Sequence, residues 1–447
     1  MKQDKFSLLT FDGFDDLMRS LGPYEKEVDI AIGVSGGADS LCLTLLAYEW
    51  IKFYKGRLFA LTVDHQLRSQ SLAEAENVGM WLEKLKISHK ILIPPIPFIK
   101  GNQQNYARNI RYKLLTDYCK QNNILHLLIA HNAEDQIESS LLNLGRGSGV
   151  YGLSGMSAVH CINSVRILRP LLTINKSIIL ATLKNFGCQT WIEDPSNTNE
   201  NYKRIQIRKL LPTLKSILPF NYVQKTISNL GYTRSAIDQI LTQVLAKSVA
   251  FYPEGYIVFC YNFFETLPFD FFLRCLSYCL LTVGNNDYTP RLRSIMNLAC
   301  EIKKGLNKKR TLAGCIIMPW KGKILICREK GLINDDILLK PGKNLWDKRF
   351  LIEIKNIEYE KEKYYIKSLN LKLWDKIKEK VSYLPIPKPV FWTLPVICDS
   401  QNNIISIPHL GYVLSEKWQE RVFFSFSPLH SLTKSHFAVV SFDRNTI

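Results

Sequence analysis

The 447-residue sequence contains 11 cysteines but has no pair spaced C-x-x-C. An odd number of cysteines without such pairs is typical of reduced thiols in the cytosol and argues against a disulfide framework. Cys275 and Cys279 come closest, and they lie in an apolar run, which favours burial over metal binding. We therefore expect a cytoplasmic protein.

The sequence also lacks an apolar stretch long enough to span a bilayer, because Arg274 or prolines interrupt the longest runs. Residues Met1 to Thr10 mix acidic and basic side chains and have no long apolar core, so we expect no secretory signal there. We expect no membrane role.

Acidic residues are scarce relative to basic ones, with 40 Asp and Glu against 58 Lys and Arg and a net charge of +18. Such an excess favours a polyanionic partner, nucleic acid first, although a lysine-rich surface that only maintains solubility stays open. Hydrophobic residues make up 46% and charged residues 22%, as in a folded globular protein.

The first half of the chain alternates short apolar runs with helical patterns, which predicts an α/β domain built on a parallel sheet. The expected strands are Val28–Val34, Leu58–Val63, His89–Ile93, Ile124–Ala130 and Val165–Leu168. The expected helices include Leu41–Phe53, Leu72–Leu85 and Tyr106–Tyr118.

This rhythm stops after about Pro212, and Tyr222–Ala250 is predicted to be one or two helices without an intervening strand. A second change, rich in Gly, Pro, Asn and Asp, falls near Gly331–Asn344. We therefore predict a catalytic domain over residues 1–216, a mainly helical middle domain over 217–335 and a small α+β domain over 336–447.

The run Ser35-Gly36-Gly37-Ala38-Asp39-Ser40 follows the first predicted strand and precedes a helix. The two glycines allow the backbone to approach a phosphate, while the two serines and the free amides of the helix start donate to it. The lysine of a Walker A loop is missing. Asp39 is placed to hold Mg²⁺ beside the anion or only to complement the helix dipole, and both interpretations stay open.

A second group of polar residues, Ala130 to Glu138, follows the fourth predicted strand, at the edge where open α/β sheets bind ligands. If a helix begins at about His131, then His131, Asp135 and Glu138 share one face. Another face carries Ile137, Leu141 and Leu144, suited to packing on the sheet. The polar row can bind Mg²⁺, hold the ammonium groups of an amino acid or accept a proton, or it can be a solvated helix edge.

Arg146 lies in the glycine-rich segment Leu144–Gly149, where it can contact phosphate or belong to an exposed loop. Arg108 and Arg111 lie three residues apart, so a helix places them on one face. Their target can be ATP, RNA or an activated base, and a solvated basic edge is the alternative.

The Ser35–Ser40 loop resembles the SGGxDS loop of the PP-loop ATPases, which cleave ATP between the α and β phosphates. Together with several further blocks it makes the chain similar to the tRNA(Ile)-lysidine synthase family. These blocks are Leu61–Arg68, Asn102–Tyr112, Ala130–Glu138, Arg146–Met156, Glu193–Asn197 and Trp346–Phe350.

The resemblance implies an enzyme that uses ATP and Mg²⁺ to adenylate C2 of the first anticodon cytidine of a tRNA(Ile) with a CAU anticodon. The side-chain amine of L-lysine then displaces AMP to give lysidine, which changes the codon read from AUG to AUA. It implies that residues 35–40 hold the ATP phosphates, with Mg²⁺ at Asp39, and that Asp64 and His65 lie near the adenosine. By the same resemblance, His131, Asp135 and Glu138 form the lysine and catalytic pocket.

The sequence departs from the family pattern at three positions. The family commonly has aspartate at Glu134, often a second histidine at Asn132, and aspartate at Asn199. Glu134 keeps the charge, whereas Asn132 loses a titratable group. Either Asp135 or Glu138 is our candidate for the group that deprotonates the lysine amine, and His131 is a third option.

The basic run Lys303–Arg310 and the basic, aromatic C-terminal region are candidate tRNA contacts. Two other functions compete with lysidine synthesis: a PP-loop tRNA thiolase, disfavoured because no C-x-x-C occurs, and an RNA-binding protein with a vestigial ATP loop. The sequence does not determine the oligomeric state, and a homodimer stays open.

Overall fold

A computed structural model describes residues 8–66, 70–94, 103–162, 164–192, 203–260, 266–286, 288–333, 336–355, 363–381, 386–419, 421–433 and 435–440. The chain forms two compact units. The first unit comprises residues Met1–Asp238 and Ser435–Ile447, and the second comprises Gln239–Lys434. The three-part division expected from the sequence stays a prediction.

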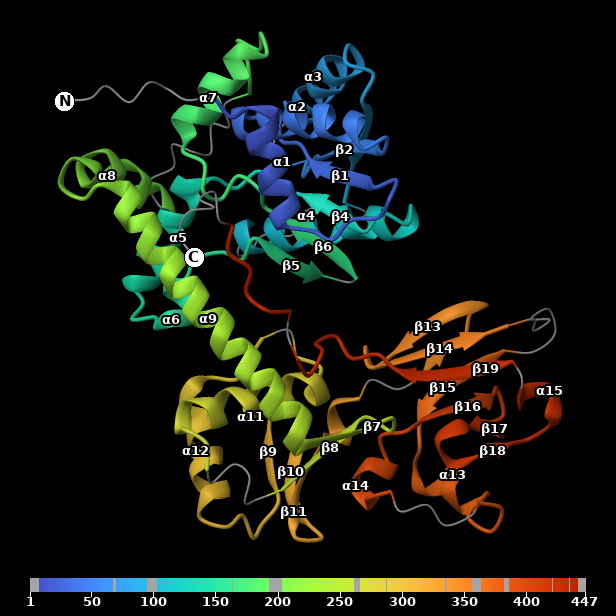
Figure 1. Ribbon diagram of the computed structural model, residues 1–447. Helices are drawn as coiled ribbons and strands as arrows, with labels where there is room; N and C mark the ends of the chain where they lie inside the picture. The colour runs from blue at the N-terminus through green and yellow to red at the C-terminus, as the bar shows by residue number, and fades with distance from the viewer. Residues whose placement is uncertain are drawn as a thin grey trace. The chain divides into compact units, whose positions relative to one another are not determined.

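The first unit alternates strands and helices along most of its length (Figure 1). Its elements are α1 (Phe11–Ser20), β1 (Asp29–Gly33), α2 (Ala38–Phe53), β2 (Arg57–Val63), α3 (Ser71–Glu83), β3 (Ser88–Leu92), α4 (Gln103–Gln121), β4 (His126–Leu128), α5 (Ala133–Leu144), α6 (Val150–Leu153), β5 (Val159–Ile162), β6 (Val165–Leu168), α7 (Lys176–Asn185), α8 (Lys203–Ile217) and α9 (Phe220–Ser248), the last of which ends in the second unit.

The sheet of the first unit has the strand order β3-β2-β1-β4-β6-β5. Neighbouring strands are parallel, except that β5 runs antiparallel to β6 at one edge. The strand order reverses direction between β1 and β4, which is where open α/β sheets bind ligands outside the carboxyl ends of the strands. The predicted parallel α/β fold is confirmed, and the edge strand β5 is an addition that the sequence analysis did not anticipate.

Apolar side chains cover both faces of this sheet, because successive residues of a strand point to opposite sides. Ile30 and Ile32 of β1 face a core shared with α1, α2 and α7, whereas Ala31 faces a second core shared with α4. Burial on both faces explains why β1 is apolar almost throughout, as parallel strands usually are.

The second unit is built on three antiparallel sheets and several helices. Its elements are β7 (Val249–Tyr252), β8 (Tyr256–Cys260), α11 (Phe269–Gly284), α12 (Leu292–Lys303), β9 (Arg310–Leu312), β10 (Cys315–Trp320), β11 (Lys323–Arg328), η2 (Lys330–Leu332), β12 (Ile337–Leu338), β13 (Gly342–Trp346), β14 (Phe350–Ile354), β15 (Tyr364–Ser368), α13 (Leu371–Asp375), α14 (Lys388–Phe391), β16 (Pro395–Asp399), β17 (Ile404–Ile407), η3 (Pro408–Leu410), β18 (Tyr412–Val413), α15 (Glu416–Gln419) and β19 (Val422–Phe426).

The sheets have the orders β7-β8-β11-β10-β9, β12-β15-β16-β17-β18 and β13-β14-β19. The long helix expected over Tyr222–Ala250 is α9. The region 217–335 also contains the five-stranded sheet that begins at β7, which the sequence analysis did not foresee. Among the described residues, no helix combines the length and apolar character needed to cross a membrane.

The Trp346–Phe350 block forms the turn between β13 and β14, and its role in the fold is electrostatic. Arg349 is fully buried, and its Nε donates to Asp347 at 2.6 Å. Arg328 of β11 donates to both oxygens of the same carboxylate at 3.1 Å. Burial lowers the pKa of Arg349, and the Asp347 carboxylate opposes this shift by favouring the charged guanidinium.

We predict that Asp347→Asn lowers the free energy of unfolding by about 3–5 kcal/mol, because it leaves the Arg328 and Arg349 charges buried without a counter-charge. A matched control is Asp336→Asn, which breaks an exposed ion pair with Lys367 and should cost less than about 1 kcal/mol. Denaturant unfolding followed by tryptophan fluorescence compares the two variants. Equal, small losses of stability in both variants would show that the Asp347 carboxylate does not stabilise the two buried arginines.

Candidate active site

The glycine loop connects β1 to α2 at the carboxyl edge of the sheet. The Oγ of Ser40 donates to the carbonyl of Gly37 at 2.9 Å and accepts from the Ser35 amide at 3.2 Å. Gly37 is the N-cap of α2 and makes no side-chain cap, so the first amides of α2 keep their capacity to bind an anion. The loop therefore has the form of a phosphate cradle.

Gly36 is required by the shape of this loop. Its φ of +80° lies in the region that favours glycine, and an added Cβ would lie 2.6 Å from Ile192 Cδ1 and 2.8 Å from Val78 Cγ2. The carbonyl of Gly36 also accepts from the Ile192 amide at 3.0 Å. A side chain at this position would push the loop away from its support.

Asp39 lies in the first turn of α2 and forms an ion pair with Lys176, whose Nζ is 2.6 Å from Asp39 Oδ1. Lys176 is the first residue of α7, and its amide donates to both carboxylate oxygens of Glu134 at 3.0 and 3.2 Å. Burial raises the pKa of Glu134, and the nearby charge of Asp39 adds to this. Glu134 thus fixes the start of α7 so that Lys176 reaches Asp39.

Asp64 and His65 follow β2 at the same edge. Asp64 is buried and accepts from the Gln66 amide at 2.8 Å. Burial lowers the pKa of His65, and the charge of Arg111 lowers it further. The two residues therefore lie beside the basic face of α4, at the edge of the sheet that also carries the glycine loop.

Helix α5 begins at Ala133, and the expectation that it begins at about His131 is wrong. Asn132 is the N-cap: its side chain accepts from the Asp135 amide at 3.0 Å, and Asp135 accepts from the Asn132 amide at 3.1 Å. This reciprocal capping box fixes the helix start, because the asparagine side chain satisfies one of the free amides of the first turn. His131 consequently does not share the helical face of Asp135 and Glu138.

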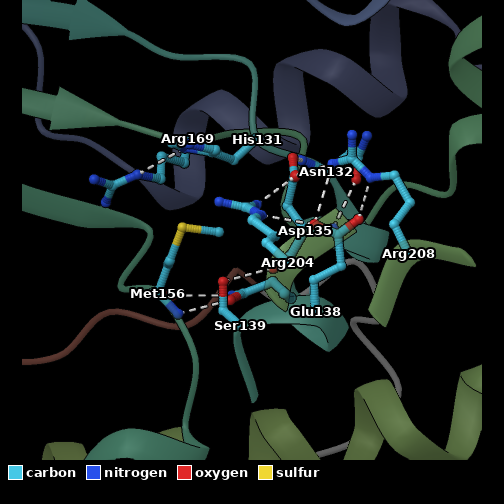
Figure 2. A network of polar contacts seen from close by, with 10 residues as sticks. His131, Asn132, Asp135, Glu138, Ser139, Met156, Arg169, Arg204 and Arg208 are labelled. Atoms are coloured by element: carbon cyan, nitrogen blue, oxygen red, sulfur yellow. Dashed lines mark hydrogen bonds and ion pairs between the residues drawn. The ribbon is translucent and has the colours of Figure 1, made fainter. Parts of the chain in front are cut away.

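Asp135 and Glu138 lie together on α5 and are paired with two arginines of α8 (Figure 2). Arg204 donates to Asp135 Oδ1 and to Glu138 Oε2, both at 2.7 Å. Arg208 donates to Glu138 at 2.6 and 3.1 Å. The Glu138 side chain is only 1% exposed, against 15% for Asp135 and 44% for Arg208.

His131 is paired with a different residue, Arg169, on the other side of Asn132 (Figure 2). The Nε of Arg169 donates to His131 Nδ1 at 3.2 Å. Burial lowers the pKa of His131 well below its usual value, and the charges of Arg169, Arg108, Arg204 and Arg111 lower it further. Because Nδ1 accepts this bond, the neutral imidazole carries its proton on Nε2.

Electrostatic interactions couple several of the predicted residues to one another. Arg108 and Arg111 of α4 act on His131, and Arg111 also acts on His65. The pKa of Arg208 is raised first by its hydrogen bond to Glu138, and the charges of Glu138, Asp135 and Asp39 add to this. The glycine loop, the carboxylates of α5 and the arginines of α4 and α8 therefore lie within range of one another.

Comparisons with known proteins agree with this geometry. A profile of the PP-loop domain matches residues 13–214. The tRNA(Ile)-lysidine synthase of Orientia tsutsugamushi (strain Boryong) is 33% identical over 429 residues, covering 92% of this chain and 96% of that protein. The chain belongs to the tRNA(Ile)-lysidine synthase family. The enzymes of that name from Wolbachia pipientis wMel (33% identity, 89% of this chain and 92% of that protein) and Rickettsia prowazekii (strain Madrid E) (32% identity, 91% and 95%) show the same relationship.

Arg146 lies apart from the other predicted residues of this lysidine synthase family member. It is exposed and follows the carboxyl end of α5, a helix of 12 residues, so about 18 Å of helix separates it from Asn132. Its phosphate contact stays a prediction. Arg68, Asn102, Asn199 and the block Glu193–Asn197 lie outside the described residues.

The apolar face of α5 also differs from expectation. Ile137 is buried against Leu211 of α8 and Ile227 of α9 rather than on the sheet, whereas Leu144 is 59% exposed. The helix therefore joins α8 and α9 to the edge of the sheet. This contact brings the arginines of α8 to the carboxylates.

Four residues of the site were missed by sequence reasoning: Arg169, Lys176, Arg204 and Arg208. Arg204 and Arg208 are spaced i, i+4, so a helix places them on one face, and this signal was present. Arg169 directly follows β6, at the carboxyl edge of the sheet, which is also a recognisable position. Lys176 had no local signal, because its contact with Asp39 depends on how α7 packs against α2.

We predict that Gly36→Ala weakens ATP binding by at least about 100-fold, because its Cβ would collide with Ile192 and Val78 at a positive φ. Gly187→Ala is the matched control: Gly187 also has a positive φ, of +78°, but its added Cβ would meet nothing within 4 Å, and it lies outside the glycine loop, so we expect less than about a fivefold loss. Titration calorimetry with ATP and Mg²⁺ measures both affinities. Equal losses in the two variants would contradict the proposed role of the Gly36 backbone.

Proposed function

We propose that the protein uses ATP to join L-lysine to C2 of the first anticodon cytidine of a tRNA(Ile) with a CAU anticodon. The products are lysidine, AMP and diphosphate, and the modified tRNA then reads AUA instead of AUG. One observation carries this proposal: in a chain of this family, a phosphate cradle and an arginine–carboxylate cluster lie at one edge of the sheet. The cluster consists of Arg204 and Arg208 with Asp135 and Glu138. A tRNA substrate supports our proposal that the enzyme acts in the cytoplasm.

In the first step, the C2 oxygen of the cytidine attacks the α-phosphate of ATP and diphosphate leaves. The amides of Gly36 to Ser40 and the helix dipole of α2 stabilise the departing charge without reorganising. Asp39 is the residue that would hold Mg²⁺, because its carboxylate borders the cradle, and the ion would neutralise phosphate charge there. In the structure Asp39 pairs with Lys176, whose positive charge balances the charge of the carboxylate. Lys176 is then free to contact phosphate when Asp39 changes partner.

The arginine–carboxylate cluster suits the lysine substrate because a free amino acid carries charges of both signs. The more exposed Arg208 can take the substrate carboxylate in a bidentate pair. When Arg208 turns to the substrate carboxylate, Glu138 loses part of its contact with Arg208. Glu138 can then bind the α-ammonium group of lysine. Recognition of lysine thus exchanges ion pairs rather than burying new unpaired charges.

The second step requires an uncharged side-chain amine, because lysine has a reference pKa of about 10.4. Asp135 is our candidate for the proton acceptor: it is more exposed than Glu138, which accepts from two arginines. His131 is a poor acceptor, because burial and the surrounding arginines lower its pKa. Its Nε2–H instead makes it a hydrogen-bond donor toward the phosphate or the activated cytidine.

The tRNA requires additional basic surface. From the last residue of α12 to the first residue of β9, the basic side chains are all exposed, while Leu306 is buried and anchors the turn. These basic residues are Lys303, Lys304, Lys308, Lys309 and Arg310. An ordered, basic turn of this kind is suited to phosphate contacts, and we propose that it binds the tRNA. We keep a homodimer as an alternative assembly for this binding.

Sulfur transfer is the enzymatic alternative, and the two buried cysteines of the first unit, Cys42 and Cys119, do not support it. Cys42 and Cys119 are buried, and burial raises the pKa of each thiol to about 12. Such thiols stay protonated at neutral pH and are poor sulfur carriers. A vestigial ATP loop is disfavoured by Gly36, whose backbone conformation still serves the cradle.

The test of this function incubates the purified protein with ATP, Mg²⁺, radiolabelled lysine and tRNA(Ile) bearing the CAU anticodon. We expect label in this tRNA and none in the methionine tRNA. Asp39→Ala should reduce incorporation by at least about 1000-fold, because it removes the carboxylate beside the phosphates. Incorporation into neither tRNA, with tRNA binding intact, would favour thiolation or a non-catalytic RNA-binding role.

Asp135→Asn and Glu138→Gln separate deprotonation from lysine binding. We expect Asp135→Asn to lower the rate of lysine transfer about 100- to 10,000-fold at pH 7 with diphosphate release retained. Its rate should rise about tenfold per pH unit toward pH 10, since the free amine then forms without a base. Glu138→Gln should chiefly raise the KM for lysine and lack this pH dependence. A pH-independent defect in Asp135→Asn would exclude Asp135 as the proton acceptor.

A further inference from the structure

The C-terminal segment Ser435–Val440 belongs to the first unit, although the whole second unit precedes it in the chain. Phe437 and Val440 are 5% and 4% exposed, and Val440 joins the core that contains α1, α2 and α7. Residues this well buried are part of the fold of the first unit. Residues 435–440 are therefore integral to the unit that carries the candidate active site.

The main chain of this segment is paired with residues 157 and 158, which precede β5. The amide of Ala438 donates to Ser157 Oγ at 3.0 Å, and the carbonyl of Ala438 accepts from the Ala158 amide at 2.8 Å. Both polar groups of one residue are thus used on two consecutive residues. This is a two-point attachment that fixes the position of residues 157 and 158.

The same two residues hold Arg169 through their carbonyl groups. Nη1 of the Arg169 guanidinium donates to the carbonyl of Ser157 at 2.6 Å. The main-chain amide of Arg169 donates to the carbonyl of Ala158 at 2.9 Å. The remaining Nε of Arg169 donates to His131 Nδ1 (Figure 2). One continuous series of hydrogen bonds therefore leads from Ala438 through residues 157 and 158 to the imidazole of His131.

The C-terminal segment packs against helix α9. Gly231 is buried in this helix, and an added Cβ would lie 2.7 Å from Val439 Cγ2 and 2.9 Å from Phe437 Cε1. The guanidinium of Arg234 lies 4.4 Å from the centre of the Phe437 ring, within cation–π range. Glycine inside a helix is unfavourable for helix formation, and here it makes room for the segment.

We infer that the C-terminal segment is a positioning element of the active site, which holds Arg169 against His131 through Ser157 and Ala158. It fixes the orientation of the His131 ring and the location of its proton on Nε2. The inference rests on the proposed function for the role of His131, but the contact itself is independent of the reaction. Ala438 and Ser157 are positioning residues, because they act on the site only through Arg169.

The decisive variant is Gly231→Ala, which displaces the segment from the opposite side without changing any residue of the site. Alanine favours a helix more than glycine, so α9 itself is not weakened. We expect kcat for lysidine formation to fall roughly 10- to 100-fold, with the KM for ATP unchanged and only a modest fall in melting temperature, because the displaced side chains belong to the core of the first unit. The double variant Gly231→Ala/Val439→Ala removes the nearest colliding atom and should restore kcat to within about threefold of wild type.

A second measurement does not depend on the reaction. In protein labelled with ¹⁵N-histidine, the His131 signal, assigned from its loss in His131→Asn, should show the Nε2–H form in wild type and a mixture of forms in Gly231→Ala. His436→Ala, an exposed position in the same segment, is the control and should change neither kcat nor the His131 signal.

Wild-type kcat in Gly231→Ala, or an unchanged His131 signal, would overturn the inference. A loss of kcat with a lowered melting temperature and no rescue by Val439→Ala would also overturn it, as a purely structural effect. If wild-type protein forms no lysidine, the proposed function fails, while the histidine spectrum still decides the inference.

Discussion

The ion pairs of Glu138 with Arg204 and Arg208 are the interaction on which the rest of the site depends. A carboxylate that is 1% exposed is stable in its charged form only when several donors replace its water. Arg204 and Arg208 supply three N–H groups to it. These donors come from α8, so the site forms only when α8 docks on α5, through the apolar contact of Ile137 with Leu211.

Asn132 shows how a departure from the family pattern is accommodated. Where the family often has a second histidine, the asparagine caps α5 and engages Asp135 in a capping box. One oxygen of Asp135 is then committed to the backbone, while the other faces Arg204. The cap therefore orients the carboxylate proposed to accept the proton. The loss of a titratable group at position 132 is matched by a gain in the rigidity of its neighbour.

The sequence predicted those parts of the site that follow from local patterns. Open α/β sheets bind ligands at the carboxyl ends of their strands, so the residues after the fourth predicted strand were expected at this edge. The start of α5 was misplaced by two residues, because the periodicity of polar residues was weighed without the capping preference of asparagine. Partners from distant segments, such as Lys176 for Asp39 and Arg169 for His131, depend on tertiary packing. The hydrogen bond from Ala438 to Ser157 joins residues 281 positions apart, and no local sequence pattern indicates it.

The charges of the site have to serve substrates of opposite sign. ATP and RNA are polyanions, and the arginines of α4 and the cradle of amides at α2 suit negative charge, whereas the lysine side chain is a cation. A bare carboxylate among these cations would bind the nearest arginine and a bare arginine would bind phosphate, so neither alone could select an amino acid. Pairing each carboxylate with an arginine leaves the empty cluster compensated. An amino acid can then enter by exchanging partners, because it brings one carboxylate and one ammonium group. Phosphate alone brings only negative charge and would leave Asp135 and Glu138 without a counter-charge, so the cluster disfavours phosphate at the place where we propose that lysine binds.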